Sequence, residues 1–266
     1  KTDVMECISQ VKRIGADCID LWPPSHGDQR TQIDLIGHDK FVRELKESGV
    51  LFEMTTRYDL GPYRLQREME VVSRLGGNMI VCGSRALLGS PLKTQVRDFI
   101  DSMKPHLSKA ESLGVTIAIE NHSNALINTP DSLKYLADLS PSPNLGIALA
   151  PYHLPQNAEL IAGLIEHCGE SIVHFYAWEH GLGCHRAMPK SHELMQLPGF
   201  GSLDFAPIMR ALMAIDYQGY TEIFMHPTPR GIPIMNTTEQ VNVVINRSRE
   251  YLSRCIARIS SGSGSM

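Results

Sequence analysis

Short apolar runs recur along the chain, and polar side chains follow each of them at its C-terminal end. Seven of these runs are expected to be strands, at residues 18–22, 50–55, 78–82, 115–119, 145–149, 172–178 and 220–225. Segments between them carry apolar residues at helical spacing and often stop at glycine. They predict eight helices, at about residues 3–14, 38–48, 62–75, 93–113, 130–138, 156–168, 204–214 and 237–258. Helices between strands indicate right-handed parallel crossovers.

This alternation predicts an α/β fold, a (β/α)8 TIM barrel whose first strand is absent from the chain, because the first predicted element is a helix. We expect one barrel domain over residues 1–259, followed by a Ser/Gly-rich linker or tail over residues 260–266. The length of 266 residues suits one such barrel. An open, doubly wound sheet is the alternative.

Composition narrows the function classes. The net charge is −4 and no basic tract is present, which argues against a nucleic-acid partner. No apolar run reaches the ~18 residues that a membrane span needs. Six scattered cysteines form no CxxC pair, so a thiolate zinc site is disfavoured and a reducing, cytoplasmic location is expected. The expected partner is a small molecule. The composition leaves open whether the chain forms a homo-oligomer.

The sequence "VTIAIENH" at residues 115–122 is the most informative stretch. It brings Glu120, Asn121 and His122 directly after a buried strand. Because parallel strands end at one rim, these side chains predict a site at that rim. Further candidates lie within or directly after the other runs: His26, Arg57, Arg85, His153, Tyr176, Trp178, His180, Glu222, His226 and Arg230. The long connection from Glu179 to Leu203 is expected to be an ordered functional loop.

Four segments resemble the xylose-isomerase-like TIM barrels, the broad sugar-phosphate isomerase/epimerase group. They are "GADCIDLWPP", "ESLGVTIAIENHSN", "NLGIALAPYHL" and "FGSLDFAPIMRALMAIDYQGYTEIF". The resemblance covers nearly the whole chain. It implies the barrel fold and a carbohydrate isomerase or epimerase, and it leaves the sugar undefined.

Of the four positions where the family carries metal ligands, the chain keeps one. Glu120 stands at the first position, whereas Ala150 replaces the usual Asp, Tyr176 the usual His and Phe224 the usual Glu. The resemblance implies a divalent metal (Mn, Mg, Zn or Co) in the functional form. Ala150 leaves open whether this chain holds it and whether it is active, and whether the alanine is natural or engineered.

From the residues themselves, Glu120, His153 and His226 form a donor set that suits a borderline metal. The expected chemistry is metal-assisted proton abstraction next to a carbonyl, with Glu120, Glu222 and His153 as catalytic residues. Residues expected to contact the sugar are His26, Arg57, Arg85, Asn121, His122, Tyr176, Trp178, His180 and Arg230. Two alternatives are a keto-sugar or keto-inositol dehydratase and a non-catalytic sugar-binding barrel.

Structural explanations compete with several of these assignments. Glu120 would be satisfied by an ion pair with Arg57 or Arg85 inside the rim. Glu222 would serve equally as part of a buried ion pair, since it lies deeper in its strand. His174 lies mid-strand, where a histidine is more often a hydrogen-bonded core residue.

Overall fold

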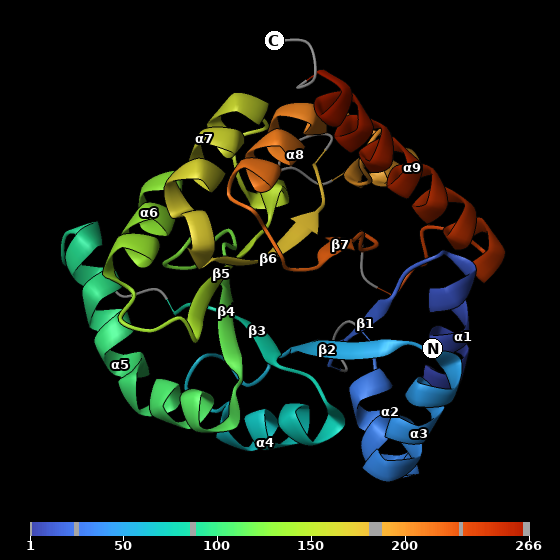
Figure 1. Ribbon diagram of the computed structural model, residues 1–266, viewed down its shortest axis with the longest axis horizontal. Coiled ribbons are helices and arrows are strands. Elements are labelled where there is room, and N and C mark those ends of the chain that lie inside the picture. Colours follow the sequence, from blue (N-terminus) through green and yellow to red (C-terminus); the bar gives the residue numbers. More distant parts are fainter. Residues whose placement is uncertain (1, 24–26, 86–88, 181–187, 229–230, 263–266) are drawn as a thin grey trace. The chain divides into compact units, whose positions relative to one another are not determined.

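The computed structural model describes residues 2–23, 27–85, 89–180, 188–228 and 231–262 (Figure 1). Within these residues, seven strands follow one another in chain order across the sheet. They are β1 (Cys18–Leu21), β2 (Leu51–Thr56), β3 (Met79–Gly83), β4 (Thr116–Glu120), β5 (Leu145–Leu149), β6 (Ile172–Ala177) and β7 (Thr221–Ile223). Every predicted strand is present. The sequential order contradicts the doubly wound alternative, because strand order reverses at the switch point of such a sheet.

All eight predicted helices are present, and within the described residues the structure adds one α-helix and three 3-10 helices that the periodicity did not predict. The helices are α1 (Val4–Arg13), α2 (Gln29–Ile36), α3 (His38–Ser48), α4 (Gln66–Leu75), α5 (Leu92–Leu113), α6 (Pro130–Leu139), α7 (Ala158–Cys168), α8 (Phe205–Ala214) and α9 (Thr238–Gly262). The additions are α2 and the 3-10 helix η3 (Lys190–Gln196), beside the short 3-10 turns η1 (Pro151–His153) and η2 (Gly169–Ser171). None of the helices in the described ranges is long and apolar enough to span a membrane.

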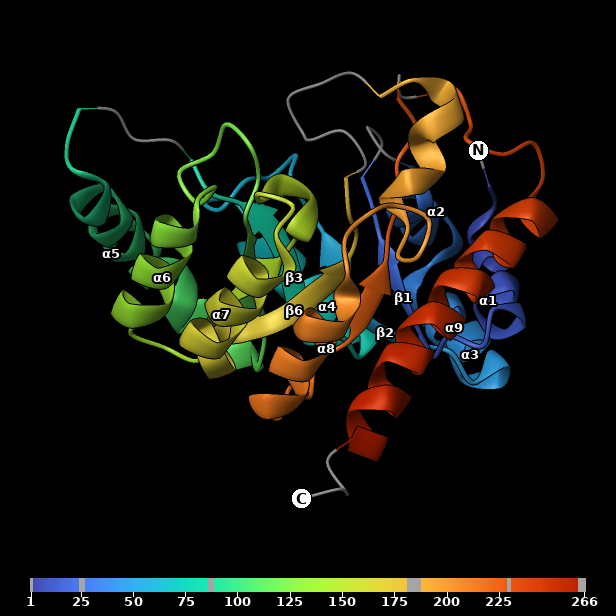
Figure 2. The same ribbon diagram turned by 90° about the horizontal axis from the view of Figure 1, so that it is seen from above.

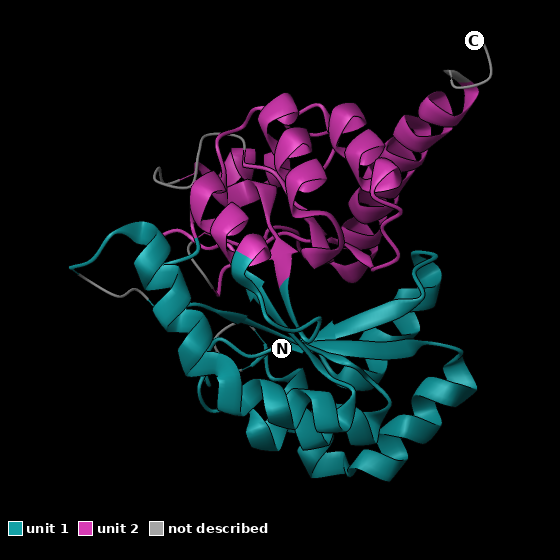
Figure 3. Ribbon diagram, turned by 60° about the vertical axis from the view of Figure 1, so that its left-hand side comes forward, with its two compact units in different colours: residues 1–120, 125–127, 139–146 teal, residues 121–124, 128–138, 147–266 magenta. Residues whose placement is uncertain are grey.

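The chain divides into two compact units (Figure 3). Unit 1 contains residues 1–120, 125–127 and 139–146. Unit 2 contains residues 121–124, 128–138 and 147–266. The α9 helix continues to Gly262, so it includes residues that the sequence assigned to the tail.

Unit 1 is built on the parallel pairs β1–β2, β2–β3 and β3–β4. Helices α3, α4 and α5 pack on these strands, as Figure 1 shows for the blue-to-green part of the chain. The register pairs Gly83 with Glu120 at the carboxyl ends of β3 and β4. The last residue of the apolar β4 run is therefore a carboxylate at a strand end.

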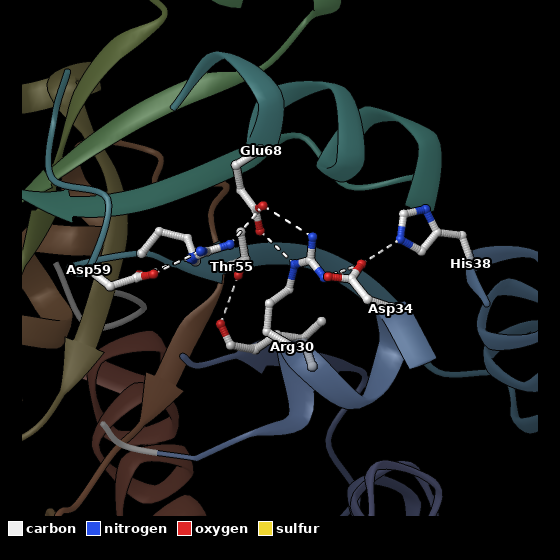
Figure 4. Close-up of polar contacts among 8 residues, drawn as sticks. Arg30, Asp34, His38, Thr55, Asp59 and Glu68 are labelled. Atoms are coloured by element: carbon white, nitrogen blue, oxygen red, sulfur yellow. Dashed lines mark hydrogen bonds and ion pairs between the residues drawn. The ribbon is translucent and has the colours of Figure 1, made fainter. Parts of the chain in front are cut away.

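An ion-pair network in unit 1 explains why α2 forms (Figure 4). The Arg30 guanidinium of α2 binds the Glu68 carboxylate of α4 through two hydrogen bonds of 2.7 and 3.1 Å. Arg57, which follows β2, lies 2.7 Å from the same carboxylate and also pairs with Asp59. Arg30 also pairs with Asp34 at 2.8 Å. Since α2 has only one buried apolar residue, Ile33, these charged contacts hold a helix that hydrophobic periodicity misses.

Unit 2 contains the parallel pairs β5–β6 and β6–β7. All five residues of β5 are buried, which accounts for its continuous apolar sequence. Helices α7, α8 and α9 pack in succession. In Figure 2, η3 lies at the end of unit 2 toward which β7 points. The polar residues that follow β5, β6 and β7 are gathered at this end.

Candidate active site

The carboxyl ends of the unit 2 strands carry a cluster of six rings, which we call the aromatic wall: Tyr152, His153, Trp178, His180, Phe224 and His226. Its centre is a stacked pair. The Tyr152 and Trp178 rings lie 3.7 Å apart between centroids and 6° from parallel, and both side chains are buried. Each of these rings combines large apolar faces with a polar group at its edge.

Three histidines of the aromatic wall surround this stack. The His180 ring lies 4.3 Å from Tyr152, His153 lies 5.3 Å from Trp178, and His226 lies 5.4 Å from Trp178, all between centroids. His122 extends the group, with its ring 4.2 Å from His153. The structure therefore brings together four histidines that the sequence predicted at strand ends.

Strand alternation explains how the rings meet. Trp178 comes two residues after Tyr176 on β6, and His226 comes two residues after Phe224 beyond β7, so each pair shares a face. The Phe224 ring lies 4.8 Å from Trp178 and 5.9 Å from Tyr176. Strand alternation predicts which residues of each strand share a face, and the ring contacts show that the two sets lie together.

Asn121 acts on the turn that carries Tyr152 and His153. Its side chain accepts a hydrogen bond from the Ala150 amide at 2.7 Å and donates one to the Ala150 carbonyl at 3.0 Å. Asn121 is completely buried. It therefore holds the start of η1, and its contact with the sugar stays a prediction.

His174 and Glu222 form a pair deeper in unit 2. The His174 Nε2 atom lies 3.1 Å from the Glu222 Oε2 atom, and the His174 side chain has no solvent exposure. The Glu222 side chain is 19% exposed. This geometry is that of the core ion pair expected as the structural alternative.

In unit 1, Glu120 lies buried at the end of β4 and shares a hydrogen bond with Tyr58. Burial and then the Glu120 charge raise the pKa of Tyr58 well above its usual range, so the phenol stays protonated and donates. Gly83 makes room for this ring, because a Cβ atom there would lie 2.8 Å from it. Tyr58 in turn stacks on Trp22, with centroids 6.5 Å apart.

Two arginines predicted to bind substrate have partners in unit 1. Burial alone would lower the pKa of Arg57, but the pairs with Asp59 and Glu68 outweigh it and hold the pKa above its usual range. Arg85 lies over the Tyr63 ring at 5.5 Å. Neither contact is the ion pair with Glu120 considered above. His26 and Arg230 lie outside the described residues.

Glu179 is a buried carboxyl that the sequence did not single out as a site residue. Its Oε2 atom accepts a hydrogen bond from the Leu203 amide at 2.8 Å, and neighbouring amides face it. Gly201 permits this approach, since a Cβ there would overlap the carboxylate. Its Oε1 atom has no hydrogen-bond partner among the described residues. Burial raises the pKa of Glu179 to about 7 against the opposing effect of the amides.

We expect this carboxyl to make stability depend on pH. Its pKa is higher in the folded chain than the usual 4.5, so the folded state binds the proton more tightly. Stability should therefore fall as the pH rises from about 4.5 to about 7, by up to roughly 3 kcal/mol from this group.

Urea unfolding at pH 5 and pH 7.5 measures the effect. Glu179→Gln should gain stability relative to the parent chain at the higher pH, whereas the exposed Glu166→Gln should show no such difference. Equal pH dependence in the parent chain and Glu179→Gln would contradict the assignment.

The metal-ligand positions implied by the resemblance do not fit a metal ion. Ala150 has no donor and is buried, and Phe224 packs on Trp178. Tyr176 is 1% exposed and packs on His174 and Phe224. In the part of the chain that the structure describes, no group of three or more His, Cys, Asp or Glu side chains is placed to hold a metal. The donor set of Glu120, His153 and His226 stays a prediction.

The family model described as xylose isomerase-like TIM barrel matches residues 8–241. The chain belongs to this family. The match confirms the predicted fold class and the resemblance seen in the strand-end motifs. Among curated protein sequences, no significant match to the chain is found.

Solved structures share the xylose isomerase-like barrel. An L-ribulose 3-epimerase has a TM-score of 0.72 and 16% identity, with 99% of this chain and 92% of that chain covered. The 3-keto-D-glucoside 4-epimerase YcjR from E. coli has a TM-score of 0.68 and 18% identity, covering 96% and 95%. The IolI protein with a bound zinc atom has a TM-score of 0.69 and 16% identity, covering 100% and 95%. At these identities the likeness shows the fold.

Sequence reasoning missed Tyr152 and Gln196 as parts of the site. Tyr152 precedes a histidine that was singled out, and only the η1 turn shows that its ring stacks on Trp178. Gln196 lies in η3, inside the connection predicted to be functional, and has no motif around it. The long loop was the one available signal for it.

Proposed function

We propose that this chain is a carbohydrate isomerase or epimerase, and that the aromatic wall binds the sugar. The stacked Tyr152 and Trp178 pair carries the proposal. Flat apolar faces with polar edges suit a sugar ring, which is itself apolar on its faces and polar around its rim. The histidines beside the stack supply ring nitrogens for hydrogen bonds to hydroxyl groups. The epimerase neighbours of the same fold support the reaction class.

We propose that the reaction begins with removal of a proton next to the sugar carbonyl, and that Glu120 is the base. It is the one carboxylate that the chain retains at the family's ligand positions. A positioned carboxylate removing such a proton contributes about 10²–10⁴-fold to the rate. His153 is the group that we propose for returning a proton, and Glu222 is the second carboxylate candidate. Because the ligand positions do not fit a metal, no step in this proposal uses one.

The test of the binding surface is a titration of the full chain with a panel of ketoses and keto-sugars, followed by calorimetry. Trp178→Ala removes half of the stack and should weaken binding of a sugar ligand by about 10-fold or more. Trp178→Phe keeps a ring and should lose less. A parent chain that binds none of the panel, or Trp178→Ala with unchanged affinity, would contradict the proposal.

A second candidate is a non-catalytic sugar-binding barrel. The observation that favours it is the loss of donors at Ala150 and Phe224, since the aromatic wall persists where ligands are missing. Proton exchange separates the two. An isomerase or epimerase moves solvent deuterium into the bound sugar, and a binding barrel does not. A dehydratase would exchange the same proton and also release water, giving a new unsaturated product.

A further inference from the structure

Gln196 is a buried side chain that no part of the proposed reaction uses. It is the last residue of η3 and is 1% exposed. Its side-chain oxygen accepts a hydrogen bond from the Trp178 indole Nε1 at 3.0 Å. That nitrogen is the indole's single polar atom, and Trp178 is itself buried at 4% exposure. The edge of the central stack is therefore anchored on Gln196.

The side-chain amide of Gln196 also forms hydrogen bonds with the backbone of His226. The His226 amide donates to the Gln196 oxygen at 3.3 Å, and the Gln196 nitrogen donates to the His226 carbonyl at 2.9 Å. The second hydrogen of that nitrogen goes to the Glu193 carbonyl at 3.0 Å. Two acceptor positions and two donor hydrogens are all used, which is the full capacity of a glutamine side chain.

The backbone of Gln196 forms a further hydrogen bond, to the segment that follows β6. Its carbonyl accepts a hydrogen bond from the Glu179 amide at 2.8 Å, directly after Trp178. One residue thus joins the segment after β6 to the segment after β7. These are the segments that carry Trp178 and His226 into the aromatic wall.

From these contacts we infer that Gln196 is the positioning residue of the aromatic wall: it sets the plane of the Trp178 indole and the distance of His226 from it. Its effect on sugar affinity rests on the proposed function, whereas its effect on the indole does not. No other standard side chain of this size offers two acceptor positions and two donors together. Methionine has the right length without the hydrogen bonds, and glutamate would turn an acceptor toward the His226 and Glu193 carbonyls.

The experiment uses the 15N-labelled full chain. Because the chain has two tryptophans, the indole N–H signal that persists in Trp22→Phe belongs to Trp178. Gln196→Met should speed hydrogen exchange of that N–H by roughly 10-fold or more and shift its resonance, since a buried bond is lost. Sugar affinity should fall by about 10-fold. Gln32→Met is the matched control, because Gln32 also accepts a backbone N–H, from Val4 at 2.7 Å in unit 1, and it should change neither quantity.

The two readouts separate the possible failures. Unchanged exchange of the Trp178 indole in a folded Gln196→Met protein would overturn the inference. If the parent chain binds no sugar, the proposed function fails, but the indole exchange still decides the role of Gln196. Should Gln196→Met not fold, the indole N–H of Trp178 in the Trp22→Phe protein decides. It should be strongly protected from exchange, and an unprotected N–H there would equally overturn the inference.

Discussion

Replacing Glu68 with glutamine is expected to lower the free energy of unfolding by about 3 kcal/mol. Glu68 is 4% exposed and is shared by the Arg30 and Arg57 guanidinium groups, at 2.7 Å from each. Removing its charge leaves two arginines near an uncharged amide, and one of them, Arg30, is only 6% exposed. Breaking a buried pair on one side costs far more than a surface pair is worth.

Urea unfolding followed by circular dichroism measures this difference. The control is Glu70→Gln on the same helix, α4. Glu70 pairs with Lys109 at 2.8 Å on the surface, so its removal should leave the unfolding midpoint unchanged. An unfolding midpoint for Glu68→Gln equal to that of the parent chain would show that the network in Figure 4 does not stabilise α2.

Replacing Glu120 with glutamine is expected to slow exchange of the proton next to the sugar carbonyl by about 10²–10⁴-fold. Glutamine keeps the size of the side chain and cannot take up the proton. The hydroxyl of Tyr58 can still donate to the new amide oxygen, so the fold of unit 1 should persist. The measurement is the rate of deuterium entry into the sugar, followed by proton NMR.

Glu47→Gln is the matched control, since Glu47 is an exposed carboxylate of α3 in the same unit. It should exchange the proton at the parent rate. Full exchange by Glu120→Gln would contradict the role of Glu120 as base and would favour Glu222, the other carboxylate predicted to be catalytic.

Most of the fold could be predicted from the sequence because it depends on local pattern. Each strand is a short apolar run, and glycines after α3, α4 and α5 mark where those helices end. The α2 helix could not be predicted in this way. It depends on Arg30 meeting Glu68, 38 positions away in the chain, and on Gln32 meeting the amide of Val4.

The sequence was sufficient to predict which segments carry the candidate site. Strand alternation places Tyr176 with Trp178 and Phe224 with His226, and in the structure these rings contact one another. The contacts of three further residues could be seen only in the structure. The Tyr152 stack depends on a single 3-10 turn, Gln196 on an unpatterned loop, and Glu179 on the amides around Gly201. No periodicity encodes contacts between loops.

The central claim is that this barrel binds a sugar on the aromatic wall and removes a proton next to its carbonyl. The most direct test incubates the full chain with a panel of ketoses and keto-sugars in deuterated water and follows the sugar C–H signals by NMR. The account predicts that at least one sugar gains deuterium next to its carbonyl, and that Glu120→Gln and Trp178→Ala both slow this exchange. Exchange for no sugar above the rate without protein would contradict it.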